Sequence, residues 1–100
     1  MDKVLSMIGF ATKAGKTASG EFSVEKAVKT GKAKLVILAD DASKSTIERF
    51  KNKCEFYKVP CIIYGTKEEL GSMTGKIIRA SVAVTDTGFS NAILNKLKEI

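Results

Sequence analysis

The stretch GEFSVEKAVKTGKAKLVILADD, residues 20–41, indicates how this chain folds. Gly20 precedes a short helix expected over residues 21–30, with Val24, Ala27 and Val28 facing the core. Gly31 follows this helix, and glycine is common there because it adopts the left-handed conformation without strain. The largely apolar residues 34–39 predict a strand buried on both faces, which is typical of a parallel sheet covered by helices. The stretch therefore predicts one helix–strand unit of an α/β fold.

Helices and strands alternate on both sides of this stretch as well. Apolar spacings of three and four predict helices over residues 2–14 and behind Ser45. Short apolar runs predict strands at residues 61–64 and 82–84, and residues 17–19 can form a further short strand. Capping-box patterns begin helices at Ser45 (with Glu48) and Thr66 (with Glu69), and Ser90 is expected to cap the last helix. With right-handed crossovers, this order predicts a single domain over residues 1–100, a three-layer α/β/α sandwich with a mixed sheet of about four strands.

The composition limits the possible functions. The 100 residues include 17 Lys+Arg against 11 Asp+Glu, and the net charge of +6 and pI near 9.4 favour a polyanionic partner such as nucleic acid. No run approaches the roughly 18 apolar residues of a membrane span, so we expect no membrane partner. The chain has no histidine, the commonest general base and metal ligand, so we expect no enzyme activity, metal or cofactor. Cys54 and Cys61 are too few for a disulfide framework and predict buried thiols in a reducing compartment, the cytoplasm.

Two patterns suggest other chemistry but have simpler explanations. Residues 9–17, GFATKAGKT, resemble a phosphate-binding P-loop, but five residues instead of four separate Gly9 from Gly15, and a helix rather than a strand precedes Gly15. Asp40, Asp41 and Asp86 follow predicted strands and can hold Mg²⁺, although carboxylates at strand ends commonly cap the next helix. We therefore expect neither nucleotide hydrolysis nor a metal site, and no small-molecule substrate.

The basic residues are the stronger functional signal. Lys26 and Lys29 share the helix at residues 21–30, and Lys76 and Arg79 lie in the predicted loop before the last strand. If the sheet brings the start of that helix beside the late loop, these cations converge on one edge. A polyanion such as RNA can bind there through its phosphates.

The late loop also contains two apolar residues, Ile77 and Ile78. Phosphate attraction needs no apolar group, whereas an unpaired RNA base gains by packing on an apolar surface. The same residues can instead plug the hydrophobic core. The sequence leaves both interpretations open.

A series of landmarks covers nearly the whole chain. They are Gly20 through Lys26-Ala27, Gly31-Lys32-Ala33-Lys34-Leu35-Val36, Ala39-Asp40-Asp41, Tyr57-Lys58-Val59-Pro60, Glu69-Leu70-Gly71, Gly75-Lys76, and Val82-Ala83-Val84-Thr85-Asp86-Thr87-Gly88-Phe89. In this order they resemble the ribosomal L7Ae/L30e superfamily of RNA-binding proteins, and within it the small bacterial YlxQ-type proteins. The family fold is an α/β/α sandwich, in agreement with the periodicity.

The resemblance implies a particular RNA and particular contacts. Members typically recognise kink-turns, RNA elements with a sharp bend, an unpaired bulge and tandem sheared G·A pairs. The start of the helix at residues 21–30 would read the G·A pairs while a lysine there meets phosphate, and the late loop would cover the bulged nucleotide. Together with the neighbouring charges, the resemblance gives these RNA-binding residues: Gly20, Glu21, Phe22, Ser23, Lys26, Lys29, Lys76, Ile77, Ile78 and Arg79.

The chain departs from the family at the base-reading positions. Strong kink-turn binders carry Gly-x-Asn-Glu-x-x-Lys-Ala, whereas this frame has Phe22 in place of Asn and Ser23 in place of Glu. Phe22 can stack but cannot hydrogen-bond, and Ser23 makes one shorter-reaching hydrogen bond. Each lost base contact removes on the order of 1–3 kcal/mol on the scale of DNA readout. We therefore expect binding that is weaker, more salt-dependent or directed at a different RNA.

Two hypotheses follow. The leading one is a non-enzymatic cytoplasmic protein that binds structured RNA, either a kink-turn or another bulged RNA such as ribosomal RNA, with the ribosome as a candidate partner. The alternative is a protein-interaction adaptor on the same fold with weakened or lost RNA recognition. In that case an exposed Phe22 would anchor a partner protein.

Overall fold

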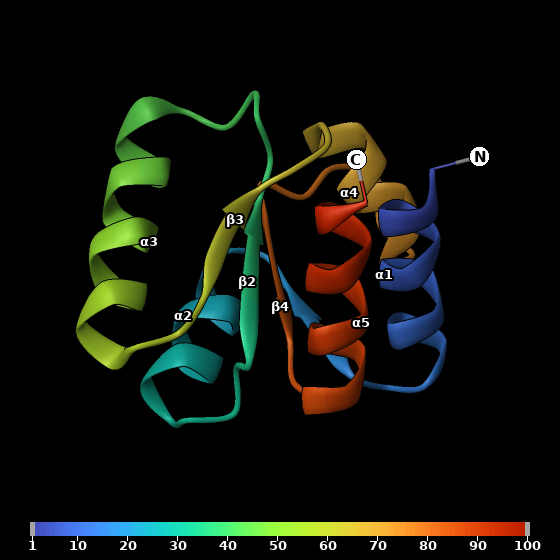
Figure 1. Ribbon diagram of the computed structural model, residues 1–100. Coiled ribbons are helices and arrows are strands. Elements are labelled where there is room, and N and C mark those ends of the chain that lie inside the picture. The colour runs from blue at the N-terminus through green and yellow to red at the C-terminus, as the bar shows by residue number, and fades with distance from the viewer. Residues whose placement is uncertain (1, 100) are drawn as a thin grey trace.

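Five helices and four strands alternate along residues 2–99, the part of the chain that the computed structural model describes (Figure 1). The helices are α1 (Lys3–Lys13), α2 (Glu21–Lys29), α3 (Lys44–Tyr57), α4 (Lys67–Met73) and α5 (Thr87–Lys98). The strands are β1 (Thr17–Ser19), β2 (Leu35–Leu38), β3 (Cys61–Ile63) and β4 (Ser81–Val84). No helix within residues 2–99 combines the length and apolar character that a membrane span requires. The predicted alternation of helices and strands is confirmed.

The sheet is mixed, with the strand order β1-β4-β2-β3. β4 pairs antiparallel with both β1 and β2, and β2 pairs parallel with β3. The two central strands, β2 and β4, are buried along their whole length. The apolar run at residues 34–39 therefore predicted burial correctly, but the parallel pairing that it suggested holds on one side of β2 only. Helices on both faces of the sheet explain the unbroken apolar sequence.

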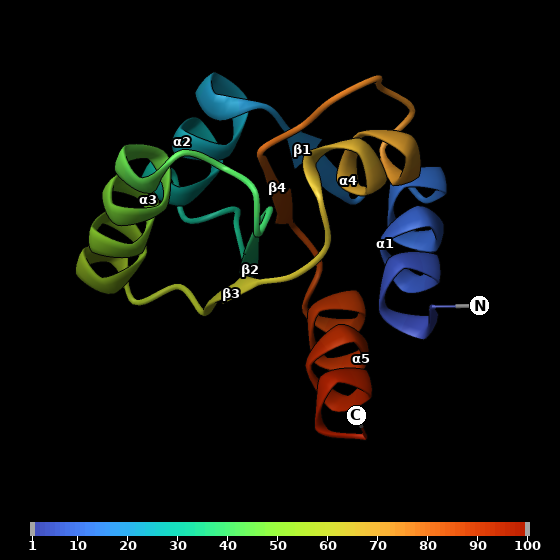
Figure 2. The ribbon, with the colours of Figure 1, turned by 90° about the horizontal axis from the view of Figure 1, so that it is seen from above.

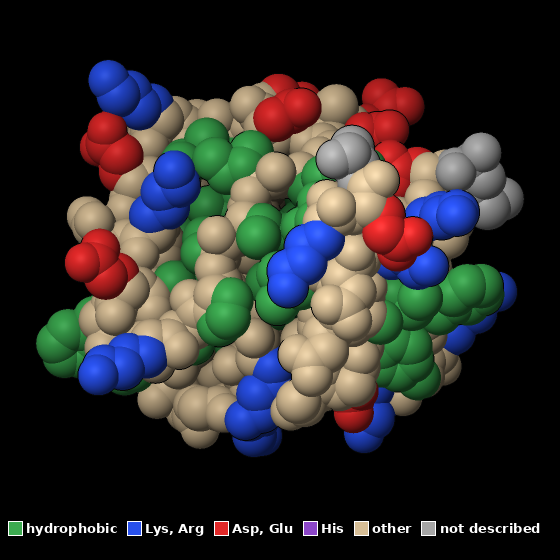
Figure 3. Space-filling model, viewed as in Figure 1, with side chains coloured by type: hydrophobic (Ala, Val, Ile, Leu, Met, Phe, Trp, Pro, Cys, Tyr) green, Lys and Arg blue, Asp and Glu red, His purple; other side chains and the backbone are tan. Residues whose placement is uncertain are grey.

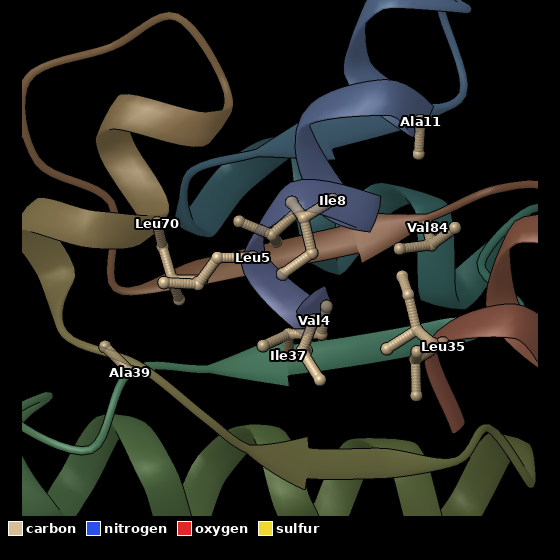
Figure 4. Packing of buried hydrophobic residues seen from close by; sticks show 11 residues of the cluster. Val4, Leu5, Ile8, Ala11, Leu35, Ile37, Ala39, Leu70 and Val84 are labelled. Carbon is tan, nitrogen blue, oxygen red and sulfur yellow. The ribbon is translucent and has the colours of Figure 1, made fainter. Parts of the chain in front are cut away.

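Helices cover both faces of the sheet and complete the predicted three-layer sandwich (Figures 1 and 2). α1, α4 and α5 pack on one face, where Val4 of α1 lies beside Ile37 of β2 (Figure 4). α2 and α3 pack on the other face, against Val36 and Leu38. Successive residues of a strand point to opposite faces, so β2 contributes to both cores in turn.

Both cysteines are free thiols. Cys54 of α3 is buried in the core, whereas Cys61 in β3 is half-buried. A hydrogen bond with Cys61, together with burial, raises the pKa of the Cys54 thiol. This thiol therefore stays protonated at neutral pH and packs as a small apolar group.

The start of α3 differs from the prediction. Ser43, and not Ser45, is the N-cap, and its hydroxyl accepts a hydrogen bond from a first-turn backbone N–H at 3.2 Å. The capping box predicted between Ser45 and Glu48 is wrong, because Ser45 already lies inside the helix. The box predicted at Thr66 is confirmed, since Thr66 and Glu69 exchange hydrogen bonds of 3.0 and 3.1 Å.

The start of α5 also differs. The Asp86 carboxylate accepts a hydrogen bond from the Phe89 N–H at 2.9 Å, and the helix begins at Thr87. The cap predicted at Ser90 is wrong because Asp86, two residues after the end of β4, reaches the first-turn N–H groups one turn earlier. Ser90 lies inside α5 and is only 2% exposed. Within residues 2–99 its hydroxyl oxygen has no hydrogen-bond partner.

We predict that Ser90→Ala raises the free energy of unfolding by about 1 kcal/mol, because a buried hydroxyl without a partner loses its hydration on folding. Chemical denaturation measures the change. Asp86→Ala is the control, and it should lower the free energy of unfolding by about 1 kcal/mol through loss of the cap. A destabilised Ser90→Ala variant would show that the hydroxyl is paired in solution.

Candidate nucleic-acid interface

The two segments predicted to bind RNA meet at one edge of the sheet. Ser19 at the end of β1 pairs with Val82 of β4, and the Gly20 N–H donates to the Ser81 carbonyl at 3.1 Å. This pairing places the start of α2 next to the loop between α4 and β4 (residues 74–80), and both lie at the same edge in Figure 2. The Arg79 side chain crosses between them, because its Nε donates to the Ser19 hydroxyl at 3.2 Å.

The N-terminus of α2 has no side-chain cap. Gly20 holds the N-cap position with φ +93° and ψ 154°, a conformation that other residues rarely adopt. The first intrahelical bond runs from the Val24 N–H to the Gly20 carbonyl, so the N–H groups of residues 21–23 precede it. These groups, with the positive end of the helix dipole, can receive an anion. Side chains cap the other four helices, through Asp2, Ser43, Thr66 and Asp86.

The outer face of α2 presents an aromatic ring followed by cations. Phe22 is 81% exposed, and Ser23 and Lys26 are also exposed. Phe22 and Lys26 stand four residues apart, so they share one helix face. They line a shallow hollow of about 440 Å³ that continues along α2 to Lys29 and Thr30. An aromatic ring for stacking and a positive charge are therefore adjacent on this face of α2.

Ion pairs engage both carboxylates of α2. Glu21 binds Arg49 of α3, and a hydrogen bond from Arg49 lowers the pKa of Glu21. Glu25 binds Lys29 at 3.0 Å and Lys53 of α3 at 3.4 Å. Lys29 is thus partly neutralised, and a hydrogen bond to Glu25 raises the pKa of Lys29. Lys26 makes no ion pair within residues 2–99, so it is the cation of α2 best placed for phosphate.

Backbone contacts hold the loop between α4 and β4 in place. The Lys76 N–H donates to the Gly71 carbonyl at 2.7 Å, and the Arg79 N–H donates to the Lys67 carbonyl at 3.0 Å. The Ile77 carbonyl packs so closely on Gly71 that a Cβ there would lie 2.5 Å from its oxygen. A further bond, from the Lys67 N–H to the Asp41 carboxylate at 2.8 Å, fixes the start of α4. The loop is therefore tethered at both ends.

The tethered loop directs its apolar side chains to solvent. Ile77 is 85% exposed and Ile78 is 53% exposed, so neither residue plugs the core. Of the two interpretations left open by the sequence, the structure favours an apolar surface available to a ligand. Gly71, which permits this arrangement, was not among the predicted site residues. Its small size inside a helix is the only sequence signal of the contact.

The charges on the face shown in Figure 3 do not define a competing site. On the face shown in Figure 3, cations and carboxylates are interspersed over the surface. Asp86 caps α5 and Asp41 binds the start of α4, so both carboxylates have the structural roles that strand ends commonly give them. Within residues 2–99, no three metal-ligating side chains come together. The edge formed by α2 and residues 74–80 is the best-supported candidate interface.

Comparison with known proteins identifies the family. Residues 2–94 match the Ribosomal protein L7Ae/L30e/S12e/Gadd45 family. The chain belongs to this family. The resemblance stated from the sequence landmarks is confirmed, and so is the α/β fold that it implied.

Individual members of the L7Ae family match most of the chain. An RNA-binding protein YlxQ of Bacillus subtilis (strain 168) is 42% identical over 91 residues, covering 91% of each chain. A large ribosomal subunit protein eL8 of Picrophilus torridus is 35% identical over 86 residues, covering 85% of this chain and 68% of that protein. A solved structure of a protein with unknown function from Bacillus halodurans C has a TM-score of 0.93 at 36% identity, covering 98% and 99% of the two chains.

We predict that Gly71→Ala lowers the free energy of unfolding by about 1–3 kcal/mol, because the new methyl group displaces the Ile77 carbonyl from α4. Chemical denaturation measures this. Gly9→Ala is the matched control: Gly9 also lies inside a helix, but its Cβ would meet only Met73 Sδ at 3.4 Å. The control should be neutral or more stable by up to about 1 kcal/mol. Equal effects of the two substitutions would contradict the crowding at Gly71.

Proposed function

We propose that this protein is a non-enzymatic, cytoplasmic RNA-binding protein that recognises a kinked or bulged structured RNA. The observation that carries the proposal is the meeting of two unlike surfaces at one edge: the uncapped start of α2 with Lys26, and the exposed isoleucines of residues 74–80. The relatives named as an RNA-binding protein and as a ribosomal protein support it. The free thiols agree with a reducing compartment.

Each part of the site suits one part of a bent RNA. The N–H groups of residues 21–23 and the Lys26 ammonium bind phosphates of one strand, and Lys76 and Arg79 bind phosphates on the other side of the bend. Ile77 and Ile78 cover an unpaired base, which needs an apolar surface once it leaves the stack. A straight duplex offers phosphates but no unpaired base, so it fills only part of this site.

The RNA partners that we propose are a kink-turn or a bulged segment of ribosomal RNA, with the ribosome as the assembly. The frame around Gly20 and Lys26 supports a kink-turn, because it keeps the phosphate-binding residues of the family pattern. Phe22 and Ser23 replace its base-reading residues, and Glu21 is held by Arg49. Affinity for a kink-turn then depends more on phosphates and unpaired bases than on the edges of paired bases.

We predict that the protein binds a kink-turn RNA more tightly than a fully paired duplex of the same length by on the order of tenfold, the scale of a single good base contact. Electrophoretic mobility shifts at one fixed salt concentration measure the two affinities. Equal affinity for the two RNAs would overturn recognition of a kinked or bulged RNA and leave only charge attraction.

We also predict that Lys26→Ala weakens binding to the kink-turn RNA and reduces the slope of log affinity against log salt by about one unit, because one phosphate contact is lost. Lys98→Ala is the matched control, since it removes the same charge from an exposed position on α5, across the sheet from α2. If the salt slope changes equally in both variants, Lys26 does not contact an RNA phosphate at this interface.

A further inference from the structure

We infer that Phe22 is a second base-stacking surface, so that the RNA recognised has at least two unpaired bases, one on Phe22 and one on Ile77 and Ile78. This inference rests on the proposed function and names the class of RNA that the same edge selects. It assigns to Phe22 a direct part in specificity.

The exposure of Phe22 has no explanation within the fold. Its ring is 81% exposed, while Val24 and Val28 of the same helix are fully buried against the sheet. An aromatic ring on the outer face of a short amphipathic helix contributes nothing to the core. Ile77 and Ile78 are likewise exposed at the same edge, so two elements present large apolar side chains to solvent there.

The groups around Phe22 favour stacking over the reading of paired bases. The ring has no hydrogen-bonding atom, and the nearby Glu21 carboxylate is engaged by Arg49. Reading the edges of a base pair requires donors and acceptors that reach into a groove. An unpaired base instead exposes its face, and an aromatic side chain binds that face without needing hydrogen bonds.

The charges around Phe22 favour a nucleic acid over an apolar protein segment. Lys26 lies one helical turn away on the same face, and both residues line the hollow along α2. The two nearby carboxylates, Glu21 and Glu25, are bound to cations of α2 and α3. Both carboxylates line the same hollow, but their ion pairs offset their charge. A base on the ring therefore brings its phosphate next to the Lys26 ammonium group.

Phe22 and the isoleucines form two separate surfaces. Phe22 lies on α2, whereas Ile77 and Ile78 lie on residues 74–80. The Arg79 side chain stands between the two elements, against Gly20 and bonded to Ser19. Two bases splayed to either side of a bend can occupy the two surfaces, with their shared phosphate near Arg79.

The test uses four hairpin RNAs that differ only at one position in the stem: a two-nucleotide bulge, the same bulge with one abasic nucleotide, a one-nucleotide bulge, and no bulge. We expect the wild-type protein to bind the two-nucleotide bulge about 5- to 100-fold more tightly than either the abasic or the one-nucleotide RNA, the scale of one base–aromatic stack. Fluorescence anisotropy measures all four affinities.

The variants are Phe22→Ala and Phe22→Tyr, which should both fold because the side chain is exposed; thermal melting checks this. We expect Phe22→Ala to bind the two-nucleotide bulge no more tightly than it binds the abasic or the one-nucleotide RNA. Phe22→Tyr keeps a ring and should keep the preference.

Different outcomes separate this inference from the proposed function. If Phe22→Ala keeps the preference, or weakens binding to all four RNAs equally, the inference is overturned. If Phe22→Ala leaves RNA binding unchanged, the result would favour the alternative hypothesis, in which Phe22 anchors a partner protein. If the wild type does not distinguish any bulged RNA from the unbulged hairpin, the proposed function itself fails.

Discussion

The antiparallel pairing of β1 with β4 is the constraint on which the candidate interface depends. It fixes Ser19 opposite Val82, and the Gly20 N–H continues the ladder by bonding to the Ser81 carbonyl. The last residue before α2 is thereby held beside the last residues of the loop that precedes β4. Segments about sixty residues apart in the sequence thereby become one surface.

At this surface the backbone N–H groups at the start of α2 are left without a capping side chain, whereas the carboxylates of α2 are engaged in ion pairs. Four of the five helices begin with a side chain that accepts from their first N–H groups, whereas α2 begins with glycine. The carboxylates of α2 point to Arg49, Lys29 and Lys53. The solvent-facing surface therefore combines backbone donors, cations and apolar side chains with carboxylates that are already engaged in ion pairs. This combination suits phosphates and the faces of unpaired bases better than the hydrogen-bonding edges of base pairs.

The fold could be predicted from the sequence because independent local signals agree. Glycines, capping residues and hydrophobic periodicity each place the same elements in the same order. The cap of α5 could not be predicted, since Asp86 and Ser90 are both good capping residues and the end of β4 decides between them. The exposure of Ile77 and Ile78 could not be predicted, because it follows from the path of the loop, whose Ile77 carbonyl packs on Gly71. The pairing of Glu21 with Arg49 joins two helices and leaves no pattern in the sequence.

The central claim is that the start of α2 and residues 74–80 bind RNA as one site. Titration of the isotope-labelled protein with a bulged RNA hairpin, followed by NMR of the backbone amides, tests it most directly. We expect the signals of residues 21–26 and 76–79 to shift together, with one common dissociation constant. Shifts confined to one of the two segments, or centred on the outer faces of α3 or α5, would contradict the composite site.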